Sequence, residues 1–471
     1  MMKRLILSVA LILWPVVCLA QGTINSGDEA GIKRTTSRLR EKVNGADAVA
    51  EAALKGQQVP GLSLVVMKGD DVLLARGYGL EDAGRKDAVT PDTVFEFGSM
   101  TKQFVAALVL RLAEEGRLSL DDPAARYLQE FTNLPPGLRI RHLLSHTSGM
   151  RDDLVKPEVA PFYMKPGSTF AEYLEVARHT TADFDPGSRW SYSNFNYQVL
   201  TVIIERLEGR SLEQALAERL FNPLGLRSIK LCPAQPGQVR GEARGHVNRG
   251  GTLVPHPPEN FALFRGPGGY CGSALDMARW TRALASGKVI SLRSYRMMTS
   301  PAKLTNGREA DYGLALSLAS PDGARRNGHG GYGGGFSSQA AYYPGAQLTV
   351  VVLTNRFVFP EYIERKVARR LLGLPEPVQR EVALPPEERG RYVGSYDVGV
   401  RGWYVQVAER EGRLWFELSR PKMSLSLIHL GNREFVSATD PDGYRLHFSK
   451  DGRELRLLGM GMMTWYGTRR P

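Results

Sequence analysis

The feature that most constrains this chain is an apolar stretch with two reactive side chains at its start, residues 95–116 (FEFGSMTKQFVAALVLRLAEEG). Ser99 and Lys102 are three positions apart, a spacing that places two side chains on the same face of a helix. The residues after Lys102 are apolar on nearly every side, which predicts a helix in the middle of a domain, ending at Gly116. We therefore expect a hydroxyl and an amine in contact at the N-terminal end of a buried helix.

This placement favours nucleophilic catalysis. Free backbone N–H groups and the positive end of the helix dipole stabilise the negative charge that develops when a hydroxyl attacks a carbonyl group. Partial removal of Lys102 from water beside that positive end would favour its neutral amine, which can accept the proton of Ser99. The S-x-x-K pattern is also common by chance, and serine is a frequent helix cap, so the interpretation needs support from elsewhere in the chain.

Two further stretches place polar residues beside predicted secondary structure. Tyr192 and Asn194 lie on a short loop, and a helix is predicted to follow over residues 197–207. Residues 327–336 (NGHGGYGGGF) are predicted as a glycine-rich loop that leads into a pair of strands within residues 337–355. Glycines in such a loop would let backbone N–H groups come close to a substrate.

Other polar clusters receive structural interpretations. His146 and Ser148 follow a short predicted helix with no acid or oxyanion donor beside them, and we interpret them as packing residues. Asp152 and Asp153 are interpreted as solvated loop residues rather than metal ligands. Residues 266–280 are rich in glycine but lack the GK[ST] ending of a phosphate-binding loop, so we expect no nucleotide there.

Composition narrows the class of protein. Hydrophobic residues make up 42% of the 471 residues and charged residues 23%, as in ordinary globular proteins. The net charge of +12 comes from scattered basic side chains with no run interleaved with aromatics, which argues against a nucleic-acid partner. No His or Cys has a partner at metal-ligand spacing, so we predict no metal and no other cofactor.

The N-terminus predicts export. The basic segment MMKR is followed by an apolar segment and a cleavage site after about Ala20, the pattern of a secretory signal peptide. Residues 1–20 are predicted to be removed and residues 21–45 to form a polar lead, giving a secreted or periplasmic protein without a stable membrane anchor. Cys232 and Cys271 then remain, and whether they pair in an oxidising compartment is left open.

A linker is predicted to divide the rest of the chain. Residues 374–388 are rich in proline and charge, and separate a mixed helix and strand region, residues 46–373, from residues 389–471. The C-terminal region contains short stretches of alternating polarity with turns between them, which predicts a small all-β barrel-like domain. Its predicted strands are residues 403–408, 414–418, 424–430, 444–449 and 454–458.

Three polar motifs follow one another along the chain in the order Ser99-x-x-Lys102, Tyr192-x-Asn194 and His329-Gly330-Gly331. Each motif alone is a weak indication of function, but their combination in this order is specific. This order resembles the S-x-x-K, S-D-N and K-T-G scheme of penicillin-recognising enzymes. With tyrosine in the second motif, the chain resembles the class C β-lactamase-like branch of penicillin-binding-protein-type serine hydrolases, which includes esterases, D-aminopeptidases and D-alanyl-D-alanine carboxypeptidases. LLSHTSG and PGSRWSYSNFNY extend the resemblance, which covers about residues 61–372. It implies an α+β fold with an antiparallel sheet flanked by helices and a helical lobe.

The resemblance also implies a role for each matching residue. Ser99 would be the acylated nucleophile, and Lys102 with Tyr192 would take its proton and later activate water. Asn194 would donate to the substrate amide or orient Lys102. The backbone N–H groups of Ser99 and Tyr332 would form an oxyanion hole. The implied substrate-binding residues are Asn194, His329, Gly330, Gly331 and Tyr332.

One departure from the scheme bears on substrate class. His329 stands where the β-lactam enzymes usually have lysine, and a neutral imidazole offers no permanent charge for a substrate carboxylate. Histidine at this position is similar to D-aminopeptidases and to several esterase-like members. The C-terminal β domain also resembles the D-aminopeptidases, in which extra β domains contribute to the site.

We therefore predict an exported serine hydrolase that cleaves amide or peptide bonds, including those of D-amino acids, through an acyl-enzyme on Ser99. A carboxylesterase would use the same machinery and stays open as an alternative. A β-lactamase or D-alanyl-D-alanine carboxypeptidase is weakened by His329. A catalytically silent penicillin-binding-like protein is weakened because Ser99, Lys102 and Tyr192 are all present. The expected partner is a small-molecule or peptide substrate, and whether that substrate comes from the cell wall is left open. The sequence does not indicate the oligomeric state.

Overall fold

The computed structural model describes residues 42–56, 59–152, 162, 165, 167–234, 237–377, 380–398, 403–419, 423–439, 443–459 and 462–470. The predicted signal peptide, most of the predicted lead and Asp153 lie outside these residues. Within the described ranges, no helix is both long enough and apolar enough to cross a lipid bilayer.

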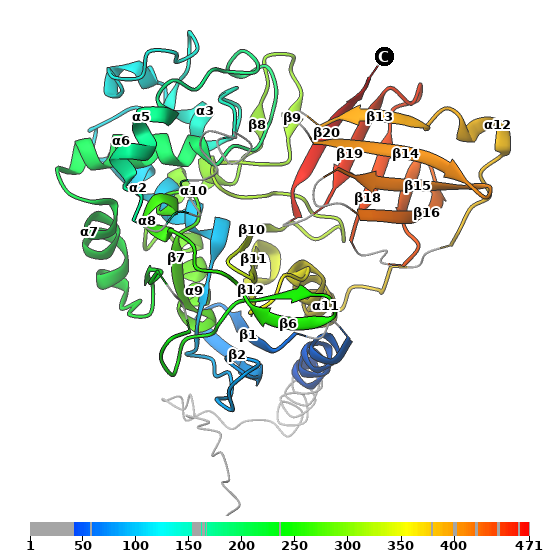
Figure 1. The fold of residues 1–471 in the computed structure, drawn as a ribbon, viewed down its shortest axis with the longest axis horizontal. Helices are drawn as coiled ribbons and strands as arrows, with labels where there is room; N and C mark the ends of the chain where they lie inside the picture. The colour runs from blue at the N-terminus through cyan, green and yellow to red at the C-terminus, as the bar shows by residue number, and fades with distance from the viewer. Residues whose placement is uncertain are drawn as a thin grey trace, which may run out of the picture. The chain divides into compact units, whose positions relative to one another are not determined.

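A five-stranded antiparallel sheet supports the first domain, with strand order β10-β11-β12-β1-β2 (Figure 1). The register of the central pair places Val65 opposite Val351. Strands β1 and β12 are buried on both faces along nearly their whole length, which explains their largely apolar sequences. The strands are β1 (Gly61–Lys68), β2 (Asp71–Gly79), β10 (Asn327–Gly333), β11 (Phe336–Tyr343) and β12 (Leu348–Thr354), with a short turn η6 (Pro344–Ala346) between the last two.

The prediction of a glycine-rich loop over residues 327–336 was wrong for most of that stretch, because it forms strand β10. Glycine is usually unfavourable inside a strand, but here there is no room for side chains. A Cβ atom on Gly331 would lie 1.9 Å from the carbonyl oxygen of Phe97, and one on Gly328 would lie 2.5 Å from that of Ala340. Only Gly334 and Gly335, at φ +52° and +80°, serve the turn to β11.

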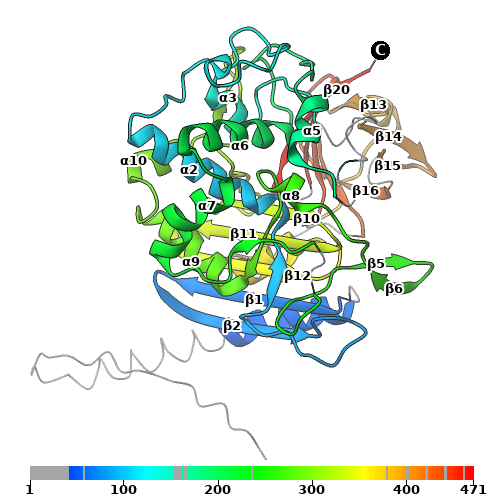
Figure 2. The ribbon, with the colours of Figure 1, turned by 60° about the vertical axis from the view of Figure 1, so that its left-hand side comes forward.

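Helices cover both faces of the sheet. On one face, a helix over residues 42–56 and α11 (Pro360–Leu372) bury Ala46, Ala50 and Val367 against the strands. On the other face, α9 (Ala274–Ala285) packs on β1, β11 and β12, with the helical lobe beyond it (Figure 2).

The helical lobe is built around α2 (Lys102–Glu114), whose first nine residues are all buried. Phe104 meets the ring of Trp280 edge-on at 4.8 Å, so the predicted central helix is confirmed. Ser99 does not belong to α2 itself, because a 3-10 turn, η1 (Gly98–Thr101), precedes it. The other helical elements are η2 (Ala124–Tyr127), α3 (Ile140–Leu144), α5 (Phe170–Ala177), α6 (Phe195–Glu208), α7 (Leu212–Leu216), η4 (Ala217–Phe221), η5 (Asn222–Leu224), α8 (Phe261–Phe264) and α10 (Leu292–Met298).

Small sheets complete the first domain. In the three-stranded sheet β3-β7-β4, the strand that leads to Ser99 pairs with β7, and a disulfide joins Cys232 to Cys271 on β7. This answers the pairing that the sequence left open. The short strands are β3 (Val94–Glu96), β4 (Lys230–Leu231), β5 (His246–Arg249), β6 (Thr252–Pro255), β7 (Tyr270–Ser273), β8 (Ala302–Lys303) and β9 (Glu309–Ala310).

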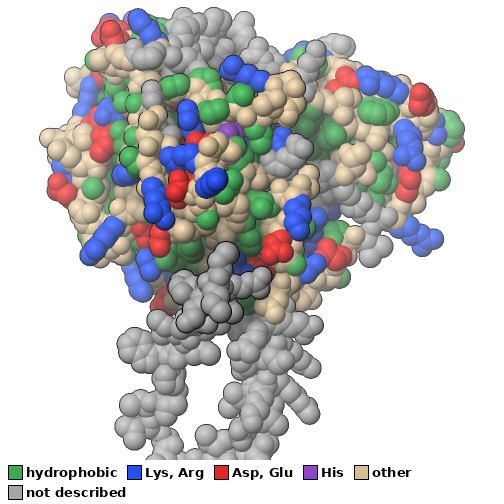
Figure 3. Space-filling view, turned by 60° about the horizontal axis from the view of Figure 1, so that its bottom comes forward, with side chains coloured by type: hydrophobic (Ala, Val, Ile, Leu, Met, Phe, Trp, Pro, Cys, Tyr) green, Lys and Arg blue, Asp and Glu red, His purple; other side chains and the backbone are tan. Residues whose placement is uncertain are grey.

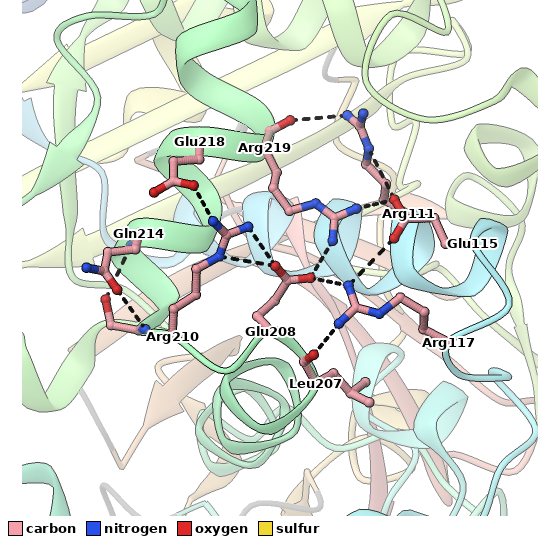
Figure 4. A network of polar contacts seen from close by, with 10 residues as sticks. Arg111, Glu115, Arg117, Leu207, Glu208, Arg210, Gln214, Glu218 and Arg219 are labelled. Carbon is pink, nitrogen blue, oxygen red and sulfur yellow. Dashed lines mark hydrogen bonds and ion pairs between the residues drawn. The ribbon is translucent and has the colours of Figure 1, made fainter.

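An ionic network joins the end of α2 to the start of α7 (Figure 4). The carboxylate of Glu208, at the end of α6, accepts hydrogen bonds from the guanidinium groups of Arg117, Arg210 and Arg219. Burial acts to raise the pKa of Glu208, but these hydrogen bonds hold it below its ordinary value. Arg219 also pairs with Glu115. The network fixes the outer end of the central helix, away from Ser99.

The C-terminal domain is a closed eight-stranded barrel, in which β13 pairs with β20 through Tyr396 and Arg469. Its interior is filled by side chains such as Val405, Phe416 and Leu446. The predicted barrel is confirmed, and the five predicted strands correspond to five of the eight; α12 (Pro386–Arg389) precedes them. The strands are β13 (Gly394–Asp397), β14 (Tyr404–Arg410), β15 (Arg413–Leu418), β16 (Met423–Gly431), β17 (Glu434–Ser437), β18 (Arg445–Phe448), β19 (Glu454–Leu458) and β20 (Thr464–Arg469).

The barrel contacts the first domain through polar groups near β9. The guanidinium of Arg308 lies 3.0 Å from Glu454, and the hydroxyl of Thr464 donates to Asp311 at 2.9 Å. Arg456 also pairs with Asp311. On the face drawn in Figure 3, basic and acidic side chains are interspersed. This agrees with the scattered basic residues of the sequence.

Candidate active site

The turn η1 and the first turn of α2 bring Ser99 and Lys102 into contact, as their spacing predicts. Lys102 is fully buried, and its Nζ lies 3.0 Å from Ser99 Oγ, 2.8 Å from Asn194 Oδ1 and 2.7 Å from the carbonyl oxygen of Pro267. The last two oxygens can only accept, so two N–H groups of Lys102 must point at them. The third position of the nitrogen faces Ser99, either as an N–H or as a lone pair.

Tyr192 covers the lysine. Its ring centre lies 4.8 Å from Lys102 Nζ, and its side chain is buried. No hydrogen bond of normal length to its hydroxyl is found among the described residues. Burial raises the pKa of Tyr192 above its ordinary value, the Ser99 side chain acts to lower it, and the charge of Asp152 raises it further. Tyr192 is therefore a neutral phenol in the resting site.

Asn194 connects the lysine to a carboxylate. While its Oδ1 accepts from Lys102, its backbone N–H donates to Asp152 Oδ1 at 3.1 Å, and its Nδ2 lies 3.4 Å from the same atom. The start of α6 positions this side chain. The interpretation of Asp152 as a solvated loop residue was wrong, because it is half-buried and bonded to a site residue.

His329 lies fully buried on β10, in a fixed tautomer. Its Nδ1 is 2.6 Å from the carbonyl oxygen of Gly330, which can only accept, so Nδ1 carries the hydrogen. Its Nε2 therefore accepts from the hydroxyl of Tyr312 at 2.9 Å. Burial, with the charges of Lys102 and Arg326, lowers the pKa of His329 to about 3 although the Gly330 carbonyl acts in the opposite direction. The imidazole is neutral at physiological pH.

Glycines bring the turn that carries Ser99 against β10. Gly98 has φ +52°, and a Cβ atom on it would lie 2.7 Å from the backbone nitrogen of Tyr332. Gly331 leaves equally little space, as described above. The backbone amides after these two glycines, those of Ser99 and Tyr332, are the predicted oxyanion-hole donors, and the glycines let the two segments pack closely on each other.

Aromatic side chains form a wall on the far side of Tyr192. The ring of His146 lies 4.2 Å from that of Tyr192, and its Nδ1 accepts from the backbone N–H of Ser193 at 3.2 Å. Burial, with the charge of Lys102, lowers the pKa of His146 well below its ordinary value. Ser148 donates to Asn196 instead of to this histidine. His146 is thus a buried neighbour of the site, as its packing interpretation predicted, and no Ser–His pair forms.

Three residues of this wall were missed by sequence reasoning. Trp190, Tyr312 and Trp465 pack together with Tyr192 and Met463, and the Trp465 ring comes from β20 of the barrel, 6.4 Å from Tyr192. Trp190 also lines a cavity of about 810 Å³ between the first domain and the barrel. No local motif marks these residues, since aromatics in a mixed sequence look like ordinary core residues.

A metal site is not found in the part of the chain that the structure describes. No three His, Cys, Asp or Glu side chains gather there in a group that could hold an ion. The polar groups that converge near Ser99 are instead an amine, a phenol, an amide and a carboxylate. These groups can move a proton to and from a serine and bind a polar substrate.

The comparison with known families decides the class. The family model described as Beta-lactamase matches residues 46–374. The chain belongs to the beta-lactamase family. It is a serine hydrolase of that family, as predicted, and its fold is the β-lactamase/transpeptidase-like fold with an added C-terminal barrel.

Individual relatives support the assignment. The D-aminopeptidase of Brucella anthropi is 30% identical over 406 residues, covering 84% of this chain and 75% of the relative. The match to the D-aminopeptidase of Brucella canis, at 29% identity, covers 70% of this chain but only 62% of that longer relative.

Among solved structures, the octameric penicillin-binding protein homologue from Pyrococcus abyssi has a TM-score of 0.64 and 24% identity, covering 90% of this chain and 100% of its own. The D-amino acid amidase from Ochrobactrum anthropi SV3 has a TM-score of 0.59 and 22% identity, covering 71% of this chain and 97% of its own. At these identities both show the fold alone.

Proposed function

We propose that this protein is an aminopeptidase that releases an N-terminal amino acid, of D configuration, from peptides and amides. The observation that carries the proposal is the line of contacts Ser99–Lys102–Asn194–Asp152, which combines a nucleophile and its base with a carboxylate for the substrate amine. The D configuration is inferred from the D-aminopeptidase of Brucella anthropi, which is 30% identical and covers 84% of this chain.

Acylation begins with Lys102 as a neutral amine. Its two N–H groups remain on Asn194 and Pro267, and its lone pair accepts the proton of Ser99 as Oγ attacks the substrate carbonyl. The oxyanion that forms accepts hydrogen bonds from the backbone N–H groups of Ser99 and Tyr332. Tyr192 gives its hydroxyl proton to the leaving nitrogen as the C–N bond breaks and receives one from Lys102. In deacylation water replaces Ser99 as the nucleophile and gives its proton to Lys102, and the bond from the acyl carbon to Ser99 Oγ breaks as Oγ receives the proton of Tyr192.

Substrate class follows from the charges around the nucleophile. The carboxylate of Asp152 is held by Asn194 close enough to act on Tyr192, and it would pair with the ammonium group of an N-terminal residue. His329 is neutral and bonded to Tyr312, so it supplies no charge for the carboxylate that β-lactams and D-alanyl-D-alanine peptides carry. Both features favour an aminopeptidase over a β-lactamase or a carboxypeptidase.

A carboxylesterase is the second candidate. The apolar wall of Trp190, Met463 and Trp465 beside Tyr192 favours it, since such a wall suits an uncharged acyl group. A carboxylesterase needs no pocket for a substrate amine. Comparing how the same variants affect ester and anilide hydrolysis therefore distinguishes the esterase from the aminopeptidase.

The deciding experiment compares hydrolysis of D-alanine p-nitroanilide, L-alanine p-nitroanilide and p-nitrophenyl acetate, with Ser99→Ala as the blank. We expect turnover of the D-anilide to exceed that of the L-anilide and to disappear in Ser99→Ala, whose thermal midpoint should be nearly unchanged. Ester turnover alone would replace the aminopeptidase by the esterase. Anilide turnover that survives in Ser99→Ala would remove the nucleophile assignment.

We also propose export to an oxidising compartment. The signal-like N-terminus and the Cys232–Cys271 disulfide support it, because disulfides persist mainly outside the cytosol. Expression of the full chain with its own N-terminus, followed by cell fractionation and N-terminal sequencing, tests it. A mature form that begins near Gln21 in the periplasm or medium is expected, and a full-length cytosolic form would contradict the proposal.

A further inference from the structure

A buried serine on β11 touches both segments that carry the proposed oxyanion-hole amides. The hydroxyl of Ser338 donates to the carbonyl oxygen of Phe97 at 2.7 Å and also lies 3.4 Å from that of Gly331. Ser338 is fully buried, and its register partner on β10 is Gly331. A Cβ atom on Gly331 would lie 2.6 Å from this hydroxyl, so only glycine lets the two strands and the serine come together.

The contact with Gly331 bears on the direction of one amide. The carbonyl of Gly331 and the N–H of Tyr332 belong to the same planar peptide group, in which the two bonds point in opposite directions. The single hydroxyl hydrogen of Ser338 lies mainly on Phe97 and is shared with the Gly331 oxygen at 3.4 Å. This weaker contact biases the direction of the N–H on the other side of the plane.

The contact with Phe97 acts on the second amide. Phe97 lies one peptide group before the Gly98–Ser99 peptide that carries the other donor, and its own N–H is held by the carbonyl of Tyr270 at 2.8 Å. The bond from Ser338 fixes the opposite side of the same residue. Gly98 packs directly on the backbone nitrogen of Tyr332, so the two segments are in contact. Ser338 contacts both of them, through the carbonyl oxygens of Phe97 and Gly331.

We infer that Ser338 is a positioning residue for the oxyanion hole, which uses one hydroxyl to align the backbone amides of Ser99 and Tyr332. The inference rests on the proposed function, because it assumes that Ser99 is the nucleophile. Preorganised donors contribute because they need not reorient as charge develops, and loss of one such donor typically costs 10²–10³ in kcat. Ser338 orients the donors without being one, so the expected cost is smaller, about tenfold.

The neighbouring residue provides a matched control. Ser337 is also a fully buried serine on β11, but its hydroxyl donates to the carbonyl of Arg356 at 3.1 Å and accepts from the N–H of Val358 at 3.0 Å. It therefore faces away from η1 and β10. Ser337→Ala and Ser338→Ala each remove one buried hydroxyl from the same strand, so their effects on stability should be similar while their effects on catalysis should differ.

The experiment measures kcat and KM for p-nitrophenyl acetate and D-alanine p-nitroanilide, and the affinity for phenylboronic acid, which forms a tetrahedral adduct with an active serine. We expect Ser338→Ala to lower kcat about tenfold with little change in KM, and to weaken the boronic acid by a similar factor. Transition-state analogues lose affinity in proportion to lost transition-state binding, which a purely structural role would not reproduce. Ser337→Ala should leave both values within about twofold of the parent.

Equal kinetics in the two variants, with turnover still dependent on Ser99, would overturn this inference alone. Turnover that does not depend on Ser99 would overturn the proposed function as well. If Ser338→Ala does not fold, Ser338→Cys replaces it, because the thiol has nearly the same shape but donates weakly. A kcat loss and a matching boronic-acid loss in that variant support the inference, and their absence overturns it.

Discussion

Two buried basic side chains, Lys102 and Arg326, have different surroundings, and the difference distinguishes a proposed catalytic residue from a structural one. Lys102 Nζ lies within hydrogen-bond distance of the neutral oxygens of Ser99, Asn194 and Pro267. The guanidinium of Arg326 instead meets the carboxylate of Glu364 at 3.0 Å, with both side chains at most 1% exposed. Burial acts to lower the pKa of Arg326, but Glu364 raises it above its ordinary value.

A base needs the first arrangement. An opposite charge in contact favours the ionised form of a cation, whereas neutral acceptors orient an amine without locking its proton. Asn194 is central to this difference, because its amide lies between Lys102 and the carboxylate of Asp152. Four changes to this pattern of charges are predicted below, from the largest expected effect to the smallest.

The largest effect is expected from Asn194→Asp, which would turn the surroundings of Lys102 into those of Arg326. A carboxylate 2.8 Å from Nζ would hold the lysine as an ammonium group, which cannot accept the proton of Ser99. We expect kcat/KM for the D-anilide to fall by about 10³-fold, within the range of 10²–10⁴ that general acid–base catalysis typically contributes. Asn194→Ala, which removes the same oxygen without adding charge, should lose less. A more active Asp variant than Ala variant would contradict the argument.

The second prediction concerns the buried ion pair of Arg326 and Glu364. Glu364→Gln leaves the Arg326 guanidinium buried against a neutral amide, and breaking a buried ion pair typically costs 3–5 kcal/mol. We expect the free energy of unfolding to fall by about 3 kcal/mol in chemical denaturation, while kcat/KM per folded molecule stays unchanged. The double variant Arg326→Met, Glu364→Leu should recover most of the stability. Loss of catalysis without loss of stability would show that the pair belongs to the site.

The third prediction uses pH. His329 lies three residues from Arg326 and has a pKa of about 3 against 6.5 in the unfolded chain, so the unfolded state binds more protons between these values. Its contribution to stability is complete above pH 6.5 and is lost as pH falls toward 3, by up to about 1.4 kcal/mol per unit. Between pH 7 and pH 5, His329→Gln should therefore lose about 2 kcal/mol less stability than the parent. Equal losses in urea titrations at the two pH values would show that His329 is not the group that titrates.

The sequence predicts the catalytic cluster better than its walls. Ser99, Lys102, Tyr192 and Asn194 were identified from short patterns because each stands next to a helix start that fixes its position locally, and the structure brings all four together. Their chemical roles remain predictions. His329 was identified as well, but its neutral tautomer depends on Tyr312, in a stretch whose sequence was uninformative.

The remaining parts depend on contacts that no local pattern records. Trp465 meets Trp190 across 275 positions of sequence, and nothing in an alternating strand distinguishes a residue of the barrel core from one that reaches a neighbouring domain. The sequence did not predict strand β10, because glycine has a low local propensity for strands. Glycine is required at Gly331 by the close approach of Phe97, which is distant in the sequence. Three barrel strands, β13, β17 and β20, were also missed, and two of them have only four residues.

The smallest predicted effect tests Asp152, the carboxylate proposed to bind the substrate amine. Asp152→Asn keeps the size of the side chain and an oxygen for the Asn194 N–H but removes the charge proposed to hold the substrate amine. We expect KM for D-alanine p-nitroanilide to rise about tenfold, or about 1.4 kcal/mol, just below the 1.5–3 kcal/mol typical of a hydrogen bond to a charged group. The constants for p-nitrophenyl acetate, which has no amine, should change less than twofold. A parallel loss on both substrates would mean that Asp152 acts through Asn194 on the base, in which case the charge that selects an aminopeptidase substrate must lie elsewhere.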